Sequence, residues 1–296
     1  MNLIKKYGYE PKAGKISAAL DVIASNIDSM ESTDKLYACF SCMDLTTLSA
    51  SDTKESVTKL VEKVNALPEN YPSFPLPASV CVYPNFASVV KGAKKDAALH
   101  VTTVAGAFPS SQSFKEVKVL ESRMAVRNGA DEVDIVLALN AFLAGDEQAA
   151  ADEISAIRAA IDEEGAALGK KVVLKVIIES GLLVSEEKIA EASLLSMEAG
   201  ADFIKTSTGK VEVNATPTAA YVMCECIRKY YEATGRKVGF KAAGGISNAK
   251  DALCYYLIVS TLLGEEWLGK DLFRLGVSRL GNSLMSAVLK ETVQYF

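Results

Sequence analysis

The sequence predicts an α/β protein that folds as a single (β/α)8 TIM barrel with an extra N-terminal helix. Eight short apolar segments alternate with longer segments of helical pattern along the 296 residues, which is typical of parallel strands joined by helices. Residues suited to chemistry lie at or near the ends of separate strands, where barrels place their active sites: Asp44, Lys175, Lys205, Lys241 and Gly276. A doubly wound open sheet is the alternative, but it gives no reason for special residues after so many strands.

Local signals predict each element in chain order. An initial helix over 16–29 precedes the repeats. The expected strands cover 37–44, 78–83, 99–105, 132–137, 172–178, 201–205, a segment ending at Lys241, and 272–275. The expected helices cover 51–66, 86–95, 113–128, 147–168, 185–200, 216–234, 248–263 and 278–292. Gly129, Gly169 and Gly200 end helices, Pro217 suits a first helical turn, and the proline-rich stretch 69–77 is a loop.

Composition indicates an ordinary globular protein; the length fits one large α/β domain or two smaller ones, and the long helices and short loops favour one domain. Residues 1–296 form the barrel domain, with a helical extension over 1–36 and a helix end and tail over 285–296. The chain is 49% hydrophobic and 23% charged, and its net charge of −5 argues against nucleic acid as a partner. No apolar run reaches membrane-spanning length, and residues 1–8 lack the apolar segment of a signal peptide. We therefore expect a cytoplasmic protein that does not bind membranes.

The cysteines and the single histidine do not predict a metal centre. Six cysteines in a chain of this length are not a disulfide framework, and we expect all six to be thiols of the core. Cys39 and Cys42 form a C-x-x-C pair, but within the strand expected over 37–44 they would face opposite sides. His100 precedes a strand and fits a hydrogen-bonded core or edge residue, so we expect no metal and no cofactor.

Two lysine motifs carry the strongest chemical signal. Lys205 lies where an apolar strand meets the turn of FIKTSTGK, and Lys241 has the same place in GFKAAGG. A lysine at a strand end is usually a solvated charge. If both side chains point into a closed barrel, however, burial and mutual repulsion lower the pKa of one of them. A neutral amine of this kind can attack a carbonyl and form a Schiff base.

These two motifs resemble those of the deoxyribose-phosphate aldolases, a family of class I (Schiff-base) aldolases. MDLTTL (43–48), CVYP (81–84), DEVD (131–134) and KVIIE (175–179) extend the resemblance over about 37–284. It implies that Lys205 is the nucleophile and that Lys241 holds the pKa of Lys205 down and assists proton transfer. It also implies that Asp134 moves protons through water, although an interior salt bridge is the alternative for this residue. No cofactor or metal is implied. The implied partners are a phosphorylated sugar and acetaldehyde, and the expected assembly is a homodimer.

Further residues are expected to bind the sugar. Asp44 and Thr46 are candidates for its hydroxyls, although an aspartate before threonines is also a common cap. Cys81 and Thr208 match family positions near the substrate, and a buried thiol is the alternative for Cys81. Lys175 points either into the charged cluster or outward under a helix, because strand parity does not decide its direction.

Three glycine turns after successive strands predict a phosphate site. Glycines let backbone N–H groups approach an anion, and a helix N-terminus favours its charge. The expected phosphate ligands are Gly209, Lys210, Gly244, Gly245, Gly276, Ser278 and Arg279. Arg279 stands where family members carry a second serine, and the penultimate Tyr295 is left unassigned.

Two other functions fit the same motifs. One is a different Schiff-base barrel, such as a transaldolase or another phospho-sugar aldolase. The other is a barrel that binds sugar phosphates without catalysis, although a passive binder has no need of two lysines held together.

Overall fold

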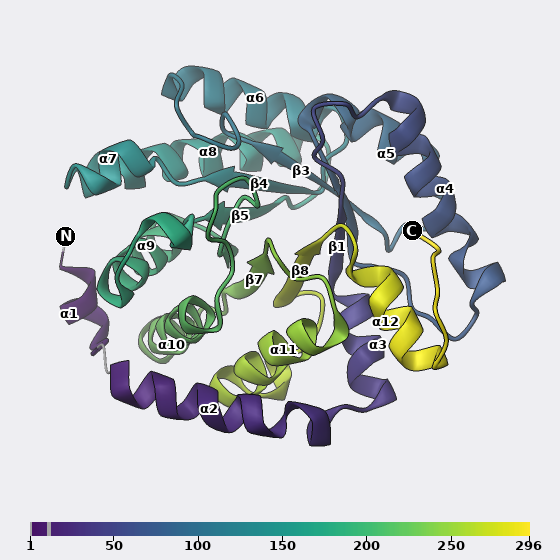
Figure 1. Cartoon of the computed structure of the whole chain (residues 1–296). Coiled ribbons are helices and arrows are strands. Elements are labelled where there is room, and N and C mark those ends of the chain that lie inside the picture. The colour runs from purple at the N-terminus through teal and green to yellow at the C-terminus, as the bar shows by residue number, and fades with distance from the viewer. Residues whose placement is uncertain (1, 11–12) are drawn as a thin grey trace.

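A computed structural model shows a closed barrel of eight parallel strands in the order β1 to β8 (Figure 1). The structure describes residues 2–10 and 13–296; Met1 and residues 11–12 of the predicted N-terminal extension lie outside this part. The helices ring the strands, and α2 lies across the outside of α10 and α11. The predicted (β/α)8 barrel with an added N-terminal helix is confirmed.

The described residues contain eight strands, each of which overlaps a predicted one. They are β1 (Met43–Thr46), β2 (Ser79–Val82), β3 (His100–Ala105), β4 (Glu132–Val136), β5 (Val173–Ile177), β6 (Phe203–Lys205), β7 (Gly239–Ala243) and β8 (Phe273–Val277). Each strand pairs in parallel with its neighbours in sequence, and β8 closes the barrel against β1. The carboxyl ends of the strands therefore meet at one face, where barrel enzymes carry their active sites.

The predicted helices are present with shifts of a few residues at their ends. They are α2 (Ala13–Met30), α4 (Lys54–Asn70), α5 (Ala87–Ala93), α6 (Lys115–Arg127), α8 (Glu147–Ala167), α9 (Glu186–Glu198), α10 (Pro217–Thr234), α11 (Ala249–Leu263) and α12 (Leu280–Leu289). Three helices were not predicted: α1 (Leu3–Tyr7), α3 (Thr33–Ser41) and α7 (Leu139–Leu143). Short 3-10 turns cover Pro84–Phe86, Ser180–Leu182 and Glu265–Trp267.

The prediction of a strand over 37–44 is wrong for most of its length. Helix α3 occupies this segment, and the Ser32 side chain caps it by accepting a hydrogen bond from the Lys35 N–H at 3.4 Å. Cys39 is therefore helical and Cys42 follows the helix, so the argument from strand alternation does not apply to them. All six cysteines are free thiols, five of them buried, and the prediction of core thiols is confirmed for those five.

The apolar core lies between the barrel and its helices. Alternation along the strands sends Ile204 and Phe240 into this core, while Lys205 and Lys241 point inward. The barrel interior therefore carries polar side chains where many barrels carry aliphatic layers. Within the described residues, no helix combines the length and apolar character needed to cross a membrane.

Candidate active site

Lys205 is the last residue of β6, and Lys241 lies beside it in the middle of β7. They are direct register partners in the sheet. Each Nζ atom donates to the same carboxylate oxygen, Asp134 Oδ2, at 2.8 Å. Asp134 and Lys241 are completely buried, and the Lys205 side chain is 5% exposed. The structure thus brings together the three residues that the resemblance marked as catalytic.

The two lysines have opposite pKa shifts. Burial is the main cause that lowers the pKa of Lys205, and the nearby positive charge of Lys241 lowers it further, while Asp134 acts in the other direction. Burial would also lower the pKa of Lys241, but its ion pairs with Asp134 and Asp44 outweigh burial and raise it. Lys241 therefore remains charged, and Lys205 is the lysine that can lose its proton.

Lys175 points into the barrel and joins the same cluster. Its Nζ atom donates to Asp134 Oδ1 at 2.9 Å, lies 3.6 Å from Asp44 Oδ2 and also pairs with Glu132. These ion pairs raise the pKa of Lys175 against the effect of burial. The open question about its direction is answered: it is an interior cation.

Arg274 and Glu132 complete the cluster, and neither was predicted as a site residue. Arg274 donates to Asp44 Oδ1 at 2.5 Å and to Glu132 Oε1 at 2.7 Å. Glu132 also accepts from His100 at 2.6 Å, and His100 is 35% exposed. The sequence does contain a clue to Glu132: it lies two residues before Asp134 and so shares a strand face with it. Charged side chains inside apolar strands need partners, which points to a charged cluster.

The cluster is electrically balanced only if one lysine is neutral. It contains three carboxylates and four basic side chains: Asp44, Glu132, Asp134, Lys175, Lys205, Lys241 and Arg274. Burial would raise the pKa of each carboxyl, but the surrounding cations keep all three well below their usual range. Lys205 contacts only one of these carboxylates. Charge balance and pKa direction therefore select the same neutral amine.

Asp44 and Cys81 lie beneath this site. Asp44 is fully buried, and its oxygens accept from Arg274, Lys241 and Ser79. Cys81 is fully buried beside Leu48 and Val104, and burial raises the pKa of its thiol. The hydrogen bonds of Asp44 hold Lys241 in place. Direct contact of Asp44 or Cys81 with the substrate stays a prediction.

A cleft of about 470 Å³ opens above Lys205 at the carboxyl face. Its walls are the turns after β1, β6, β7 and β8. Thr46 and Thr208 line it together with Lys205 and all seven predicted phosphate ligands: Gly209, Lys210, Gly244, Gly245, Gly276, Ser278 and Arg279. The fold thus brings residues from four separate turns to one cavity.

The local backbone explains the glycines. Gly209, Gly244 and Gly245 have φ between +80° and +86°, which favours glycine. A Cβ atom on Gly276 would lie 3.0 Å from Lys241 Cε and 2.9 Å from Ala243 Cβ, so this position must stay small for Lys241 to fit. Arg279 lines the cleft and immediately precedes α12, whose first turn has no side-chain cap for its N–H groups.

Glu179 lies near the cleft, and its role there was not predicted from the sequence. It follows β5, is 1% exposed, and has φ of +50°. Its carboxylate binds the Thr208 N–H at 3.1 Å and the Thr208 hydroxyl at 2.5 Å. KVIIE in the sequence marked the segment, but nothing in the sequence tied Glu179 to Thr208.

Tyr295 lies away from the cleft in this structure. Its hydroxyl donates to the Lys63 carbonyl at 2.6 Å and accepts from Asn70 at 3.2 Å. The next residue, Phe296, packs on Phe40. The tail is thus held against α3 and α4, beside the barrel (Figure 1).

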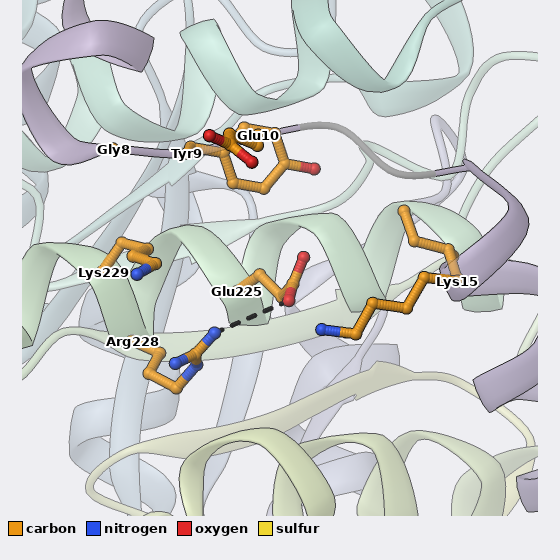
Figure 2. A pocket seen from close by; sticks show the side chains of 8 residues that line it. Gly8, Tyr9, Glu10, Lys15, Glu225, Arg228 and Lys229 are labelled. Carbon is orange, nitrogen blue, oxygen red and sulfur yellow. Dashed lines mark ion pairs between the residues drawn. The ribbon is translucent and has the colours of Figure 1, made fainter.

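A second cavity, of about 310 Å³, lies outside the barrel between the N-terminal segment and α10 (Figure 2). Its wall mixes charges of both signs, and Arg228 lies 3.6 Å from Glu225 within it. None of the predicted site residues lines this cavity. The barrel cleft is therefore the candidate active site.

Three comparisons with known proteins show the family of this chain. The DeoC/LacD family aldolases match residues 39–255. A Caenorhabditis elegans protein named "Putative deoxyribose-phosphate aldolase" is 40% identical over 269 residues, which cover 90% of this chain and 86% of that protein. The tetrameric deoxyribose phosphate aldolase of Aeropyrum pernix is 26% identical, with a TM-score of 0.66, over 94% of this chain and 98% of that one. An aldolase called QR15 is 28% identical, with a TM-score of 0.66, over 85% and 96% of the two chains. This chain therefore belongs to the DeoC/LacD family of aldolases.

Proposed function

We propose that this chain cleaves 2-deoxy-D-ribose 5-phosphate reversibly into D-glyceraldehyde 3-phosphate and acetaldehyde, through a Schiff base on Lys205. The observation that carries the proposal is a buried amine of lowered pKa at the floor of a cleft whose rim suits a phosphate. The 40% identity to the Caenorhabditis elegans protein supports the choice of sugar. The reaction belongs to deoxyribonucleoside catabolism, and the cytoplasm is the predicted location.

The first stage forms the Schiff base. The neutral Nζ atom of Lys205 attacks the aldehyde carbon of the open-chain sugar and gives a carbinolamine. This intermediate takes up a proton at its hydroxyl and loses water to form a protonated imine. Asp134, which accepts hydrogen bonds from both Lys205 and Lys241, relays this proton together with Lys241 through water.

The second stage breaks the carbon–carbon bond. A base, Asp134 acting through water, removes the proton of the 3-hydroxyl. The C2–C3 electron pair moves into the protonated imine, which becomes an enamine, and C3 leaves as the aldehyde of glyceraldehyde 3-phosphate. Protonation of the enamine at its terminal carbon restores an imine, and water then releases acetaldehyde and frees Lys205. No electrons are gained or lost overall.

The rim of the cleft would hold the phosphate. Arg279 provides a fixed positive charge, and no ion pair of Arg279 is found among the described residues. The uncapped first turn of α12 and the glycine turns after β6 and β7 add N–H donors. The Nζ atom of Lys210 donates a hydrogen bond to the Leu48 carbonyl at 2.7 Å and so closes the cleft between the turns after β1 and β6.

We infer a class I mechanism, in which the imine is the electron sink and no metal is needed. The expected result is an unchanged cleavage rate after treatment with a chelator. Activity that is lost and then restored by a divalent cation would identify a metal-dependent aldolase.

Borohydride trapping tests the proposal directly. Reduction in the presence of acetaldehyde should leave a stable adduct on the peptide that holds Lys205, and Lys205→Arg should abolish both the adduct and cleavage. Lys229→Arg, at an external lysine, is the matched control. An adduct on another peptide overturns the assignment, and faster turnover of ketose phosphates than of deoxyribose 5-phosphate would indicate a transaldolase-like enzyme.

The dimer is also a proposal, and we place its contact on α6. Four apolar side chains on one face of this helix are 49–78% exposed: Phe114, Val117, Leu120 and Met124. Covering this stripe with a second copy would remove apolar surface from water. The helix carries Glu116 and Arg123 one heptad apart, so an antiparallel pair of α6 helices would bring charges of opposite sign near each other, although Arg123 already pairs with Glu163 in its own chain. Light scattering of the purified protein distinguishes a monomer, a dimer and a tetramer like that of Aeropyrum pernix.

A further inference from the structure

Glu179 is a buried carboxyl without a cationic partner. It is 1% exposed, and no ion pair of Glu179 is found among the described residues. Its backbone has φ of +50°, a conformation that non-glycine residues seldom adopt. Strained, buried polar residues of this kind concentrate at functional sites, where the surrounding structure holds them.

The contacts of Glu179 lead into the cleft. It accepts both the N–H and the hydroxyl of Thr208, and the Thr208 oxygen in turn accepts the N–H of Lys210 at 3.1 Å. Lys210 reaches across to the Leu48 carbonyl. A single line of hydrogen bonds therefore runs from the end of β5 along the β6 turn to the β1 turn. Thr208, in the middle of this line, forms part of the cleft wall with Lys205.

The chemistry of the two side chains fixes the direction of the Thr208 hydroxyl. An ionised carboxylate can only accept hydrogen bonds, whereas a hydroxyl has one hydrogen to donate and two lone pairs. The Thr208 hydrogen must therefore point to Glu179. One lone pair takes the Lys210 N–H, which leaves the second lone pair to accept a bond from a group in the cleft.

We propose that Glu179 is a positioning residue that makes Thr208 an acceptor for a hydroxyl of the substrate and so selects hydroxylated aldehydes. The proposal rests on the proposed aldolase function. It concerns selectivity, because Glu179 acts through Thr208 and takes no part in the chemistry at Lys205. Its consequence is a preference for an acceptor aldehyde that carries a hydroxyl between the reacting carbonyl and the phosphate.

The test uses the reaction in the synthetic direction at pH 8, because burial raises the pKa of Glu179 from the usual carboxyl value of about 4 and the carboxyl must be ionised. Acetaldehyde is condensed with D-glyceraldehyde 3-phosphate or with 3-oxopropyl phosphate, which lacks the hydroxyl. We expect Glu179→Gln to reduce the preference for the hydroxylated acceptor in kcat/KM by about 10-fold, the effect of about one hydrogen bond. The glutamine amide donates to Thr208 and forces its hydroxyl hydrogen elsewhere.

Two variants of Thr208 provide the controls. Thr208→Val should lose the same preference, and the double variant should lose no more than either single variant, because both changes remove one interaction. Thr208→Ser keeps the hydroxyl and should keep most of the preference. An equal loss for both acceptors in Glu179→Gln, or an unchanged preference, overturns the proposal.

Trapping separates failure of this proposal from failure of the proposed function. Glu179→Gln should still form the borohydride adduct with acetaldehyde on Lys205, because acetaldehyde has no hydroxyl to present. A folded variant with normal trapping and an unchanged preference overturns only the role of Glu179. If the unmodified protein forms no adduct on Lys205, the aldolase mechanism itself is wrong.

Discussion

Gly276→Ala offers the most direct check that packing positions Lys241. The added Cβ atom would lie 3.0 Å from Lys241 Cε, whereas carbon atoms prefer separations of about 3.5–4.0 Å. Lys241 must then move by about 0.5 Å. The added Cβ atom would also lie 2.9 Å from Ala243 Cβ, so it meets two neighbours at once.

This displacement acts on the hydrogen bonds of Lys241. Its contacts with Asp44 at 2.5 Å and Asp134 at 2.8 Å would lengthen. A misplacement of about 1 Å can cost about 100-fold in rate, so about half of it should cost about 10-fold, or about 1.4 kcal/mol in the barrier.

The assay is exchange of the methyl hydrogens of acetaldehyde with deuterated water, followed by NMR. Exchange requires the Schiff base, the enamine and proton transfer near Lys205, but it does not require a phosphate. A slower exchange thus reports on Lys241 and not on the phosphate rim that Gly276 also lines. Gly269→Ala is the matched control, because nothing lies within 4 Å of the added atom. Exchange by Gly276→Ala at the rate of the control would refute the reasoning.

Three further predictions concern pH and assembly. Lys205 acts as a neutral amine, so kcat/KM should rise with pH around the lowered pKa of Lys205. Lys241→Met removes a neighbouring positive charge, which raises the pKa of Lys205, so the rise in the pH–rate profile should move to higher pH. The pKa of Glu132 is lower in the folded protein than in the unfolded chain, so Glu132 contributes stability above about pH 4 and loses that contribution as pH falls. Glu132→Gln should therefore show a smaller decrease of the thermal midpoint in acid than the unmodified protein. An equal decrease in both proteins would contradict this. Leu120→Glu should convert the proposed dimer to a monomer in light scattering without loss of acetaldehyde trapping, and an unchanged mass would exclude α6 as the contact.

Local patterns predicted most of the barrel and the two lysines. A lysine at the end of a short apolar strand, followed by a glycine turn, recurs on neighbouring strands, and parallel pairing then places Lys205 beside Lys241. The same reasoning brought the glycine turns to one face. The strand signal failed at 37–41, where an apolar run is compatible with either a helix or a strand. Ser32 as a helix cap was the overlooked clue.

The rest of the site depends on contacts between distant segments. Lys175 faces inward because it is the register partner of Asp134 on β4, and the pattern of β5 alone does not show this pairing. Arg274 and Asp44 come from opposite ends of the chain and meet only because β8 pairs with β1. Glu179 and Thr208 are joined across two separate turns, so their hydrogen bonds could not be derived from either segment alone.

The three buried carboxylates and their three permanent cations have a consequence for the covalent intermediates. Once Lys205 is converted to a protonated imine, the barrel interior carries one positive charge that it has no anion to match. Conversion to the uncharged enamine takes that positive charge off Lys205, while the proton of the 3-hydroxyl passes to Asp134, so the total charge of the site stays the same at this step. We therefore expect these buried charges to favour loss of the positive charge from the imine, and with it bond scission, as far as Asp134 can pass the accepted proton on through water.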